Sequence, residues 1–173
     1  KENTTWVDEP FNYSEWQMNQ ETVDYKQLTA DNIVFCEGYY VKDNPYFNWL
    51  PFNPVKGETL VGKVDGYALP FIVNQGKWVI PIGNNELRLG ATYSWHQLDF
   101  LPTEDGKKDL MNVAEKILKQ DFIPLRQYAG VRPATKDRRP ILGKHPEFSS
   151  LYIFNGLGTK GVSLAPFFAQ QLG

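Results

Sequence analysis

The sequence predicts an α+β fold, in which an antiparallel or mixed sheet is flanked by one long helix. Most of the 173 residues form short apolar or alternating runs separated by Gly, Asn and Pro, a pattern typical of antiparallel strands. Only the segment after Thr103 is long and carries apolar residues spaced by three and four. A sheet with so few helices is an α+β arrangement, and the length is that of one domain.

Strands account for the first half of the chain. The sequence predicts one strand near Thr22–Leu28 and a fully apolar one at Ile33–Cys36, which is the pattern of a strand covered on both faces. A further strand is expected near Thr59–Val64. Residues 68–95 predict a meander of three antiparallel strands, because the turn signals Asn-Gln-Gly and Gly-Asn-Asn divide this segment.

Two helices are predicted in the second half. The first begins after Thr103, whose hydroxyl can accept a hydrogen bond from a free N–H of the first turn. Near the end, a short apolar strand at Leu151–Phe154 leads through a glycine loop into a helix at Val162–Leu172. The apolar face expected on the first helix comprises Leu110, Val113, Ala114, Ile117 and Leu118.

The glycine loop spells GxGxxG at Gly156, Gly158 and Gly161. A complete dinucleotide-binding unit also needs a second strand and an acidic residue about 20 residues further on, and the residues after Gly161 do not provide them. The loop is therefore either a tight turn or a different kind of ligand site. Glycines let the backbone approach a ligand, and a helix N-terminus offers free N–H groups.

Composition excludes several classes of function. The net charge of −2 and the pI near 5.7 make nucleic acid an unexpected partner. Cys36 is the only cysteine, so no internal disulfide forms; its apolar surroundings predict a small buried side chain, and a cytoplasmic location is expected. His96 and His145 lack metal-ligand spacing, so no metal is expected. Neither a signal peptide nor a membrane-spanning apolar run is present in the sequence.

Four segments in this order resemble the second half of FAD-dependent oxidoreductases of the D-amino acid oxidase and glycine oxidase family. "ADNIVFCEGYY" is similar to the late strand of the FAD domain, and "LPFNPVKGETL" and "LRLGATYSW" are similar to parts of the substrate sheet. The segment "YAGVRPATKDRRPILGKHPEFSSLYIFNGLGTKGVSLAP" resembles the family signature G-x-R-P…D-x-x-P-x-x-G…G-x-x-x-x-G…AP. This last segment is the most specific, since both order and spacing are kept over almost its whole length.

The resemblance implies a fragment whose N-terminal FAD-binding half, with the true Rossmann fingerprint, is absent. Residues 1–173 would then be a single piece. About 30–40 and 150–173 would be the last strands and the C-terminal helix of the Rossmann-like FAD domain, and about 1–29 and 41–149 would be the substrate domain. The cofactor implied is FAD, and the isolated fragment is expected to be inactive and colourless.

The resemblance also implies roles for particular residues. The glycine loop and the start of the following helix would lie against the pyrimidine side of the flavin, where N–H groups stabilise negative charge. Lys160 could add a positive charge there or be a solvated surface lysine. The cofactor residues expected on this basis are Gly38, Leu157, Gly158, Thr159, Lys160, Gly161 and Val162.

Arg132 is the predicted substrate anchor. It precedes a proline and is therefore held in an extended conformation, and its guanidinium can grip a carboxylate through two hydrogen bonds. Tyr93 is expected on the wall of the same cleft, bonding substrate or simply packing. Glycine oxidases have an arginine where this chain has Thr159, so the resemblance does not carry over a substrate.

The complete protein is thus expected to oxidise a C–N bond of a small amine or amino acid by hydride transfer to flavin. Two alternatives stay open. One is a non-catalytic aromatic-rich binding module, since 25 of the 173 residues are Phe, Trp or Tyr. The other is a flavoprotein that acts on a modified nucleoside in RNA, which the acidic pI disfavours.

Overall fold

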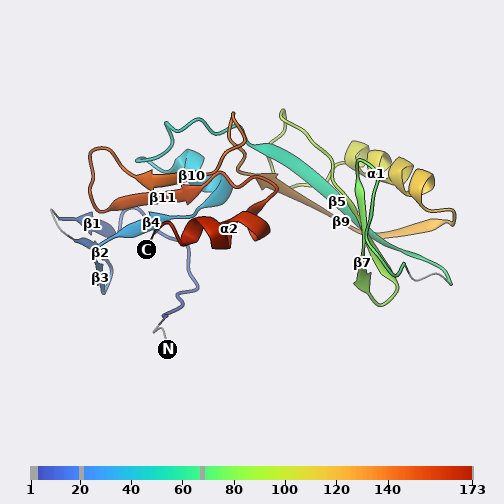
Figure 1. Ribbon diagram of the computed structural model, residues 1–173, viewed down its shortest axis with the longest axis horizontal. Helices are drawn as coiled ribbons and strands as arrows, with labels where there is room; N and C mark the ends of the chain where they lie inside the picture. The colour runs from blue at the N-terminus through green and yellow to red at the C-terminus, as the bar shows by residue number, and fades with distance from the viewer. Residues whose placement is uncertain (1–3, 20–21, 67–68, 173) are drawn as a thin grey trace.

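Two groups of strands lie at opposite ends of an elongated molecule (Figure 1). The computed structural model describes residues 4–19, 22–66 and 69–172. At one end is a three-stranded sheet of order β10-β11-β4 with a small sheet β1-β2-β3 beside it, and at the other is a five-stranded sheet of order β6-β7-β8-β5-β9. The antiparallel and mixed pairing agrees with the predicted α+β class.

The three-stranded sheet joins the two apolar segments that the sequence singled out. β4 (Ile33–Phe35) pairs in parallel with β11 (Leu151–Asn155), which confirms the expected adjacency. β10 (Ile141–Lys144) completes the sheet antiparallel to β11, although the sequence placed these residues with the substrate domain. Because β4 ends at Phe35, Cys36 follows it and is exposed, so the expectation of a buried thiol was wrong.

The small sheet replaces the single strand predicted near Thr22–Leu28. β2 (Val23–Tyr25) and β3 (Leu28–Ala30) form a hairpin, because Lys26 adopts a positive φ of 54° and reverses the chain; β1 (Trp16–Met18) pairs with β2. A shared apolar core packs this sheet against the three-stranded one. Its buried members are Val23, Phe35, Val41, Phe47, Leu151 and Ile153.

The five-stranded sheet contains the predicted meander, formed by β6 (Val73–Asn74), β7 (Trp78–Gly83) and β8 (Glu86–Gly90). β5 (Val55–Val64) pairs with β8 on one side and with β9 (Phe122–Arg132) on the other. The sequence did not predict β9 as a strand. Pro and Gln interrupt its apolar pattern, and its length comes from pairing with β5 from end to end.

α1 (Glu104–Ile117) covers one face of this sheet, as Figure 1 shows. The Thr103 hydroxyl accepts a hydrogen bond from the Gly106 N–H at 3.0 Å, which confirms the predicted cap. Of the predicted apolar face, Leu110, Ala114 and Leu118 are buried and Val113 is half-buried. The core beneath α1 comprises Leu60, Val64, Leu69, Val79, Leu87, Leu89, Leu110, Ala114, Leu118 and Phe122.

The C-terminal helix exposes two of its large apolar side chains. α2 runs over Gly161–Ala169, slightly earlier than predicted, and none of its residues is buried. Val162 is 97% exposed and Phe167 is 59% exposed. A second short helix that the sequence did not predict, η1 (Gly38–Asp43), follows β4. Among the residues described, no helix has the length and apolar character needed to cross a membrane.

Candidate functional site

A cavity of about 520 Å³ lies where the end of β9 meets the glycine loop that follows β11. The end of β5, the segment after β8, the turn after β9 and the glycine loop each contribute to its wall. Arg132, Tyr93 and residues 156–160 all line it, so the shared cleft expected from the sequence is present. It opens at the carboxyl end of the parallel pair β4 and β11, the usual position of ligand sites in such sheets.

The guanidinium of Arg132 contains a buried nitrogen that has no hydrogen-bond partner in the part of the chain that the structure describes. Among the residues described, no other arginine that lines this cavity has such a nitrogen. Arg132 is the last residue of β9, and its Nη1 is buried without a hydrogen-bond partner within the described chain. A buried donor left unpaired costs free energy, because it has lost water and gained nothing in return. An anionic ligand in the cavity would supply the missing acceptor.

Gly57 on β5 makes room for this guanidinium. A Cβ added to Gly57 would lie 2.2 Å from both Nη1 and Nη2 of Arg132. Glycine in the middle of a strand often marks such a close approach. Gly57 was not among the predicted site residues, because the sequence predicted this strand to begin only near Thr59 and the flanking residues Lys56 and Glu58 are charged.

Tyr93 packs against the same guanidinium. The Cζ atom of Arg132 lies 4.8 Å from the centroid of the Tyr93 ring, within the range of a cation–π contact. The ring of Trp95 stacks beside Tyr93 at a centroid distance of 6.3 Å and also lines the cavity. Both aromatic side chains remain more than half exposed, so their faces are available to a ligand.

A buried lysine holds the Tyr93 segment in place. The backbone of Lys56 exchanges hydrogen bonds with Ser94 at 2.8 and 3.0 Å, while its Nζ contacts Asp99 Oδ1 at 2.5 Å and the Leu101 carbonyl at 2.6 Å. The hydrogen bond from Lys56 lowers the pKa of Asp99 below its ordinary value, with smaller contributions from Gln97 and the Leu101 N–H. Lys56 itself is 1% exposed and Asp99 is 37% exposed, so this contact ties the loop at the surface to a buried lysine.

The glycine loop has the backbone conformation that its glycines allow. Gly156 and Gly158 have φ values of +76° and +55°, in the left-handed region. A Cβ on Gly156 would lie 2.7 Å from Cγ2 of Thr135, so the loop packs directly against the turn after β9. Within the described residues, no side chain caps the N-terminus of α2 after Lys160, which leaves its N–H groups available.

Asn155 joins this loop to the end of β4. Its Nδ2 donates to the Gly38 carbonyl at 2.9 Å, and its Oδ1 accepts from the Gly156 N–H at 2.8 Å. Gly38 therefore lies beside the glycine loop but does not line the cavity. The preceding residue, Glu37, accepts hydrogen bonds from Tyr13 and Asn44; burial and the Glu37 contact raise the pKa of Tyr13.

The predicted cofactor residues divide into two groups. Leu157, Gly158, Thr159 and Lys160 line the cavity, whereas Gly161 and Val162 begin α2 outside it. The cofactor roles of all seven predicted residues, and the substrate roles of Arg132 and Tyr93, remain predictions. Sequence reasoning did not include Lys136 and Arg138 in the site, although both line this cavity.

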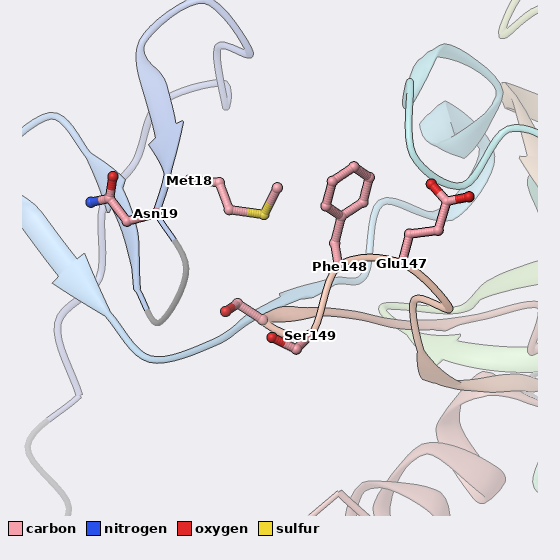
Figure 2. A pocket seen from close by; sticks show the side chains of 6 residues that line it. Met18, Asn19, Glu147, Phe148 and Ser149 are labelled. Carbon is pink, nitrogen blue, oxygen red and sulfur yellow. The ribbon is translucent and has the colours of Figure 1, made fainter.

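A second hollow, of about 740 Å³, lies near the opposite end of β11 (Figure 2). Met18 and Phe148 stand on facing segments, and Glu147 lies at one end. Among the described residues, its lining includes no cationic side chain and no glycine loop. Its chemistry therefore offers much less to a charged ligand than the Arg132 cavity does.

The chain is similar to known proteins both in sequence and in structure. Residues 7–173 match the DAO family, described as FAD dependent oxidoreductase. The glycine oxidase of Pseudomonas aeruginosa is 30% identical over 145 residues, which cover 81% of this chain and 40% of that protein. The crystal structure of glycine oxidase from Geobacillus kaustophilus matches with a TM-score of 0.70 and 25% identity, over 87% of this chain and 43% of that one.

A more distant relative is named for a different function. The tRNA 5-methylaminomethyl-2-thiouridine biosynthesis bifunctional protein MnmC of Idiomarina loihiensis is 25% identical over 165 residues, covering 91% of this chain and 27% of that protein. The chain thus spans less than half the length of the relatives it matches. The family match over residues 7–173 establishes its membership. This chain belongs to the DAO family of FAD-dependent oxidoreductases.

Proposed function

We propose that this chain is the substrate-holding part of an enzyme that oxidises a C–N bond of a small amine or amino acid with FAD. The observation that carries the proposal is the buried, unpaired Nη1 of Arg132 in a cavity that the glycine loop also lines. FAD, when bound, accepts a hydride from the substrate carbon, and the resulting imine is then hydrolysed by water. The residues described here contribute binding and orientation.

Arg132 holds the substrate carboxylate. Its planar guanidinium can donate two parallel hydrogen bonds, which fix both the position and the direction of a carboxylate. Gly57 and Tyr93 set the plane of the guanidinium from two sides. The carbon to be oxidised is one bond from the carboxylate, so gripping the carboxylate also places that carbon. Orientation of this kind is the main contribution a protein makes to such a reaction.

The residues of the glycine loop are suited to a flavin edge. The helix N-terminus after Lys160 has a partial positive charge and lacks a side-chain cap in the described chain, which favours an electron-rich carbonyl or ring nitrogen. The positive φ of Gly158, together with the open space around its Cα, lets a flat ring system approach the backbone. Leu157, Thr159 and Lys160 complete this wall.

The uncovered apolar face of α2 supports a further partner, the N-terminal FAD-binding half of a longer protein. Val162 and Phe167 are exposed to a degree unusual for such apolar residues, and the relatives are more than twice the length of the matched region. On this proposal the complete protein, rather than this chain alone, is the active unit.

The two alternatives, an RNA-modifying flavoprotein and an aromatic-rich binding module, have weaker support than amine oxidation. The MnmC relative shares only 25% identity with this chain, and the net charge of −2 disfavours nucleic acid as a partner. An aromatic-rich binding module would need a continuous exposed aromatic surface. Phe35 and Phe47, by contrast, lie in the buried core with their aromatic neighbours.

Substitution of Arg132 in the FAD-loaded complete protein tests the proposal. Arg132→Lys keeps the positive charge but loses the planar fork, so kcat/KM for glycine should fall about tenfold or more while FAD remains bound. The matched control is Arg139→Lys, at an exposed arginine outside the cavity lining, which should behave like the wild type. Unchanged kinetics for Arg132→Lys would remove Arg132 from the role of carboxylate anchor.

A further inference from the structure

We infer that the substrate of this site carries a second anionic group and that Arg138 holds it. The inference rests on the proposed function and makes its substrate class more specific: a secondary amine or amino acid with two carboxylates. Arg132 would hold the carboxylate next to the oxidised carbon. Arg138 would hold the carboxylate at the other end of the molecule.

The first observation is the charge of the cavity. Four cationic side chains line it, those of Arg132, Lys136, Arg138 and Lys160, and no Asp or Glu among the described residues does so. Within the described chain, none of the four forms an ion pair with a carboxylate. The protein as a whole has a net charge of −2, so this concentration of positive charge is local. Lys160 belongs to the wall proposed for the flavin, so three cationic side chains remain for the substrate, and one carboxylate would neutralise only one of them.

The second observation is the backbone of Arg138. Its φ is +63°, in the left-handed region where a side chain is disfavoured and glycine is not. The other described non-glycine residues with a positive φ are Lys26, Asn84 and Asn85, all at hairpin turns, and asparagine tolerates this conformation well. The Lys26 side chain forms ion pairs with Glu9 and Glu15, whereas Arg138 forms no ion pair within the described chain. A residue kept in an unfavourable conformation points to a role for its side chain, here a side chain that lines the cavity.

The third observation is that the Arg138 turn is rigidly placed. The Arg138 N–H donates to the Thr135 carbonyl at 3.2 Å, the Thr135 hydroxyl donates to the Arg139 carbonyl at 2.8 Å, and Asp137 Oδ1 accepts from the Arg139 N–H at 3.0 Å. Those bonds occupy Asp137 with the backbone, and Asp137 does not line the cavity. Thr135 packs against Gly156, so the turn and the glycine loop form one wall.

A matched pair of amines separates one anionic group from two. N-methylglycine has one carboxylate, and iminodiacetate is the same amine with a second carboxylate on the methyl carbon. Diglycolate and methoxyacetate replace the amine nitrogen by oxygen and therefore bind without being oxidised to an imine. Because Arg138 is exposed, both pairs are compared at one fixed ionic strength.

The FAD-loaded complete protein should favour the dianion of each pair by about tenfold or more, an effect expected of one charge-assisted hydrogen bond. Arg138→Gly should reduce this preference to less than threefold, in kcat/KM for the amines and in the calorimetric Kd for the ethers. Glycine suits the positive φ, so this variant removes the guanidinium without disturbing the fold. Arg139→Gln, which removes a neighbouring charge outside the cavity lining, should keep the preference.

Several results would overturn the inference. One is that Arg138→Gly still prefers the dianion of each pair as strongly as the wild type does. Another is that Arg139→Gln loses this preference equally, which would show a general effect of charge. A weakened affinity for FAD in Arg138→Gly, with the preference unchanged, would assign Arg138 to the cofactor. If neither amine is oxidised, the proposed function fails, while the Kd values of the two ethers still decide whether Arg138 binds a second carboxylate.

Discussion

The guanidinium of Arg132 occupies the space that a side chain on Gly57 would fill. Two glycines face each other across β5 and β9, since Gly57 pairs with Gly130, and their surroundings differ completely. A Cβ on Gly57 would lie 2.2 Å from both terminal nitrogens of Arg132, whereas a Cβ on Gly130 would meet nothing within 4 Å. The position of the proposed carboxylate anchor thus depends on the absence of one methyl group.

Gly57→Ala should therefore move Arg132 out of place and weaken substrate binding. A flexible arginine can shift away from the new methyl group, so the fold should survive while KM for glycine rises about tenfold or more in the FAD-loaded complete protein. Gly130→Ala, in the opposite strand of the same pair, is the control and should leave KM within about twofold of the wild type. Equal effects of the two substitutions would contradict the proposed dependence.

Acid should weaken the contact between Lys56 and Asp99. The pKa of Asp99 lies below its ordinary value of 3.8, chiefly because of the Lys56 hydrogen bond. A carboxyl group with a lowered folded-state pKa contributes stability above its unfolded pKa, and this contribution is lost as the pH falls through the folded value. Asp99→Asn should thus lower the free energy of unfolding at pH 7, and the difference from the wild type should shrink below pH 4.

Urea unfolding across this pH range measures the effect, with Asp121→Asn as a control at an exposed aspartate. The control should show no comparable pH-dependent difference. A difference between wild type and Asp99→Asn that stays constant down to pH 2 would mean that the Asp99 charge contributes nothing to stability.

Removal of the Thr103 hydroxyl should destabilise the five-stranded sheet together with α1. Thr103 Oγ1 caps the helix and also donates to the buried Glu58 at 2.7 Å, a carboxylate that Gln127 and the Thr103 N–H contact as well. Thr103→Ala should cost about 1–2 kcal/mol of unfolding free energy, the usual range for a lost cap. Thr103→Ser keeps the hydroxyl and should stay within about 0.5 kcal/mol of the wild type.

The chain of 173 residues is expected not to retain FAD when it is purified alone. Of the predicted cofactor residues only the glycine loop lines the cavity, and the apolar residues Val162 and Phe167 of the following helix are exposed. After incubation with FAD and gel filtration, the protein should lack visible flavin absorption. A yellow protein with one FAD per chain would show that the site is more complete than this expectation allows.

Local patterns in the sequence were enough to predict much of the fold. The meander, the cap of α1 and the two short apolar strands depend on turn residues, on helical spacing and on burial, all of which are properties of neighbouring residues. The signature from Tyr128 to Pro166 placed Arg132 and the glycine loop in one cleft because the family resemblance carried the tertiary contact with it.

The tertiary structure decided what no local pattern could specify. β9 exists because its full length pairs with β5, despite an interrupted apolar pattern, and that register is determined by burial summed over the whole sheet. Only this register brings Arg132 over Gly57. Likewise, the turn after β9 becomes part of the site through its contact with Gly156, which makes Arg138 a lining residue. Such contacts join segments far apart in the sequence, so they follow from packing of the complete fold rather than from the propensities of either segment.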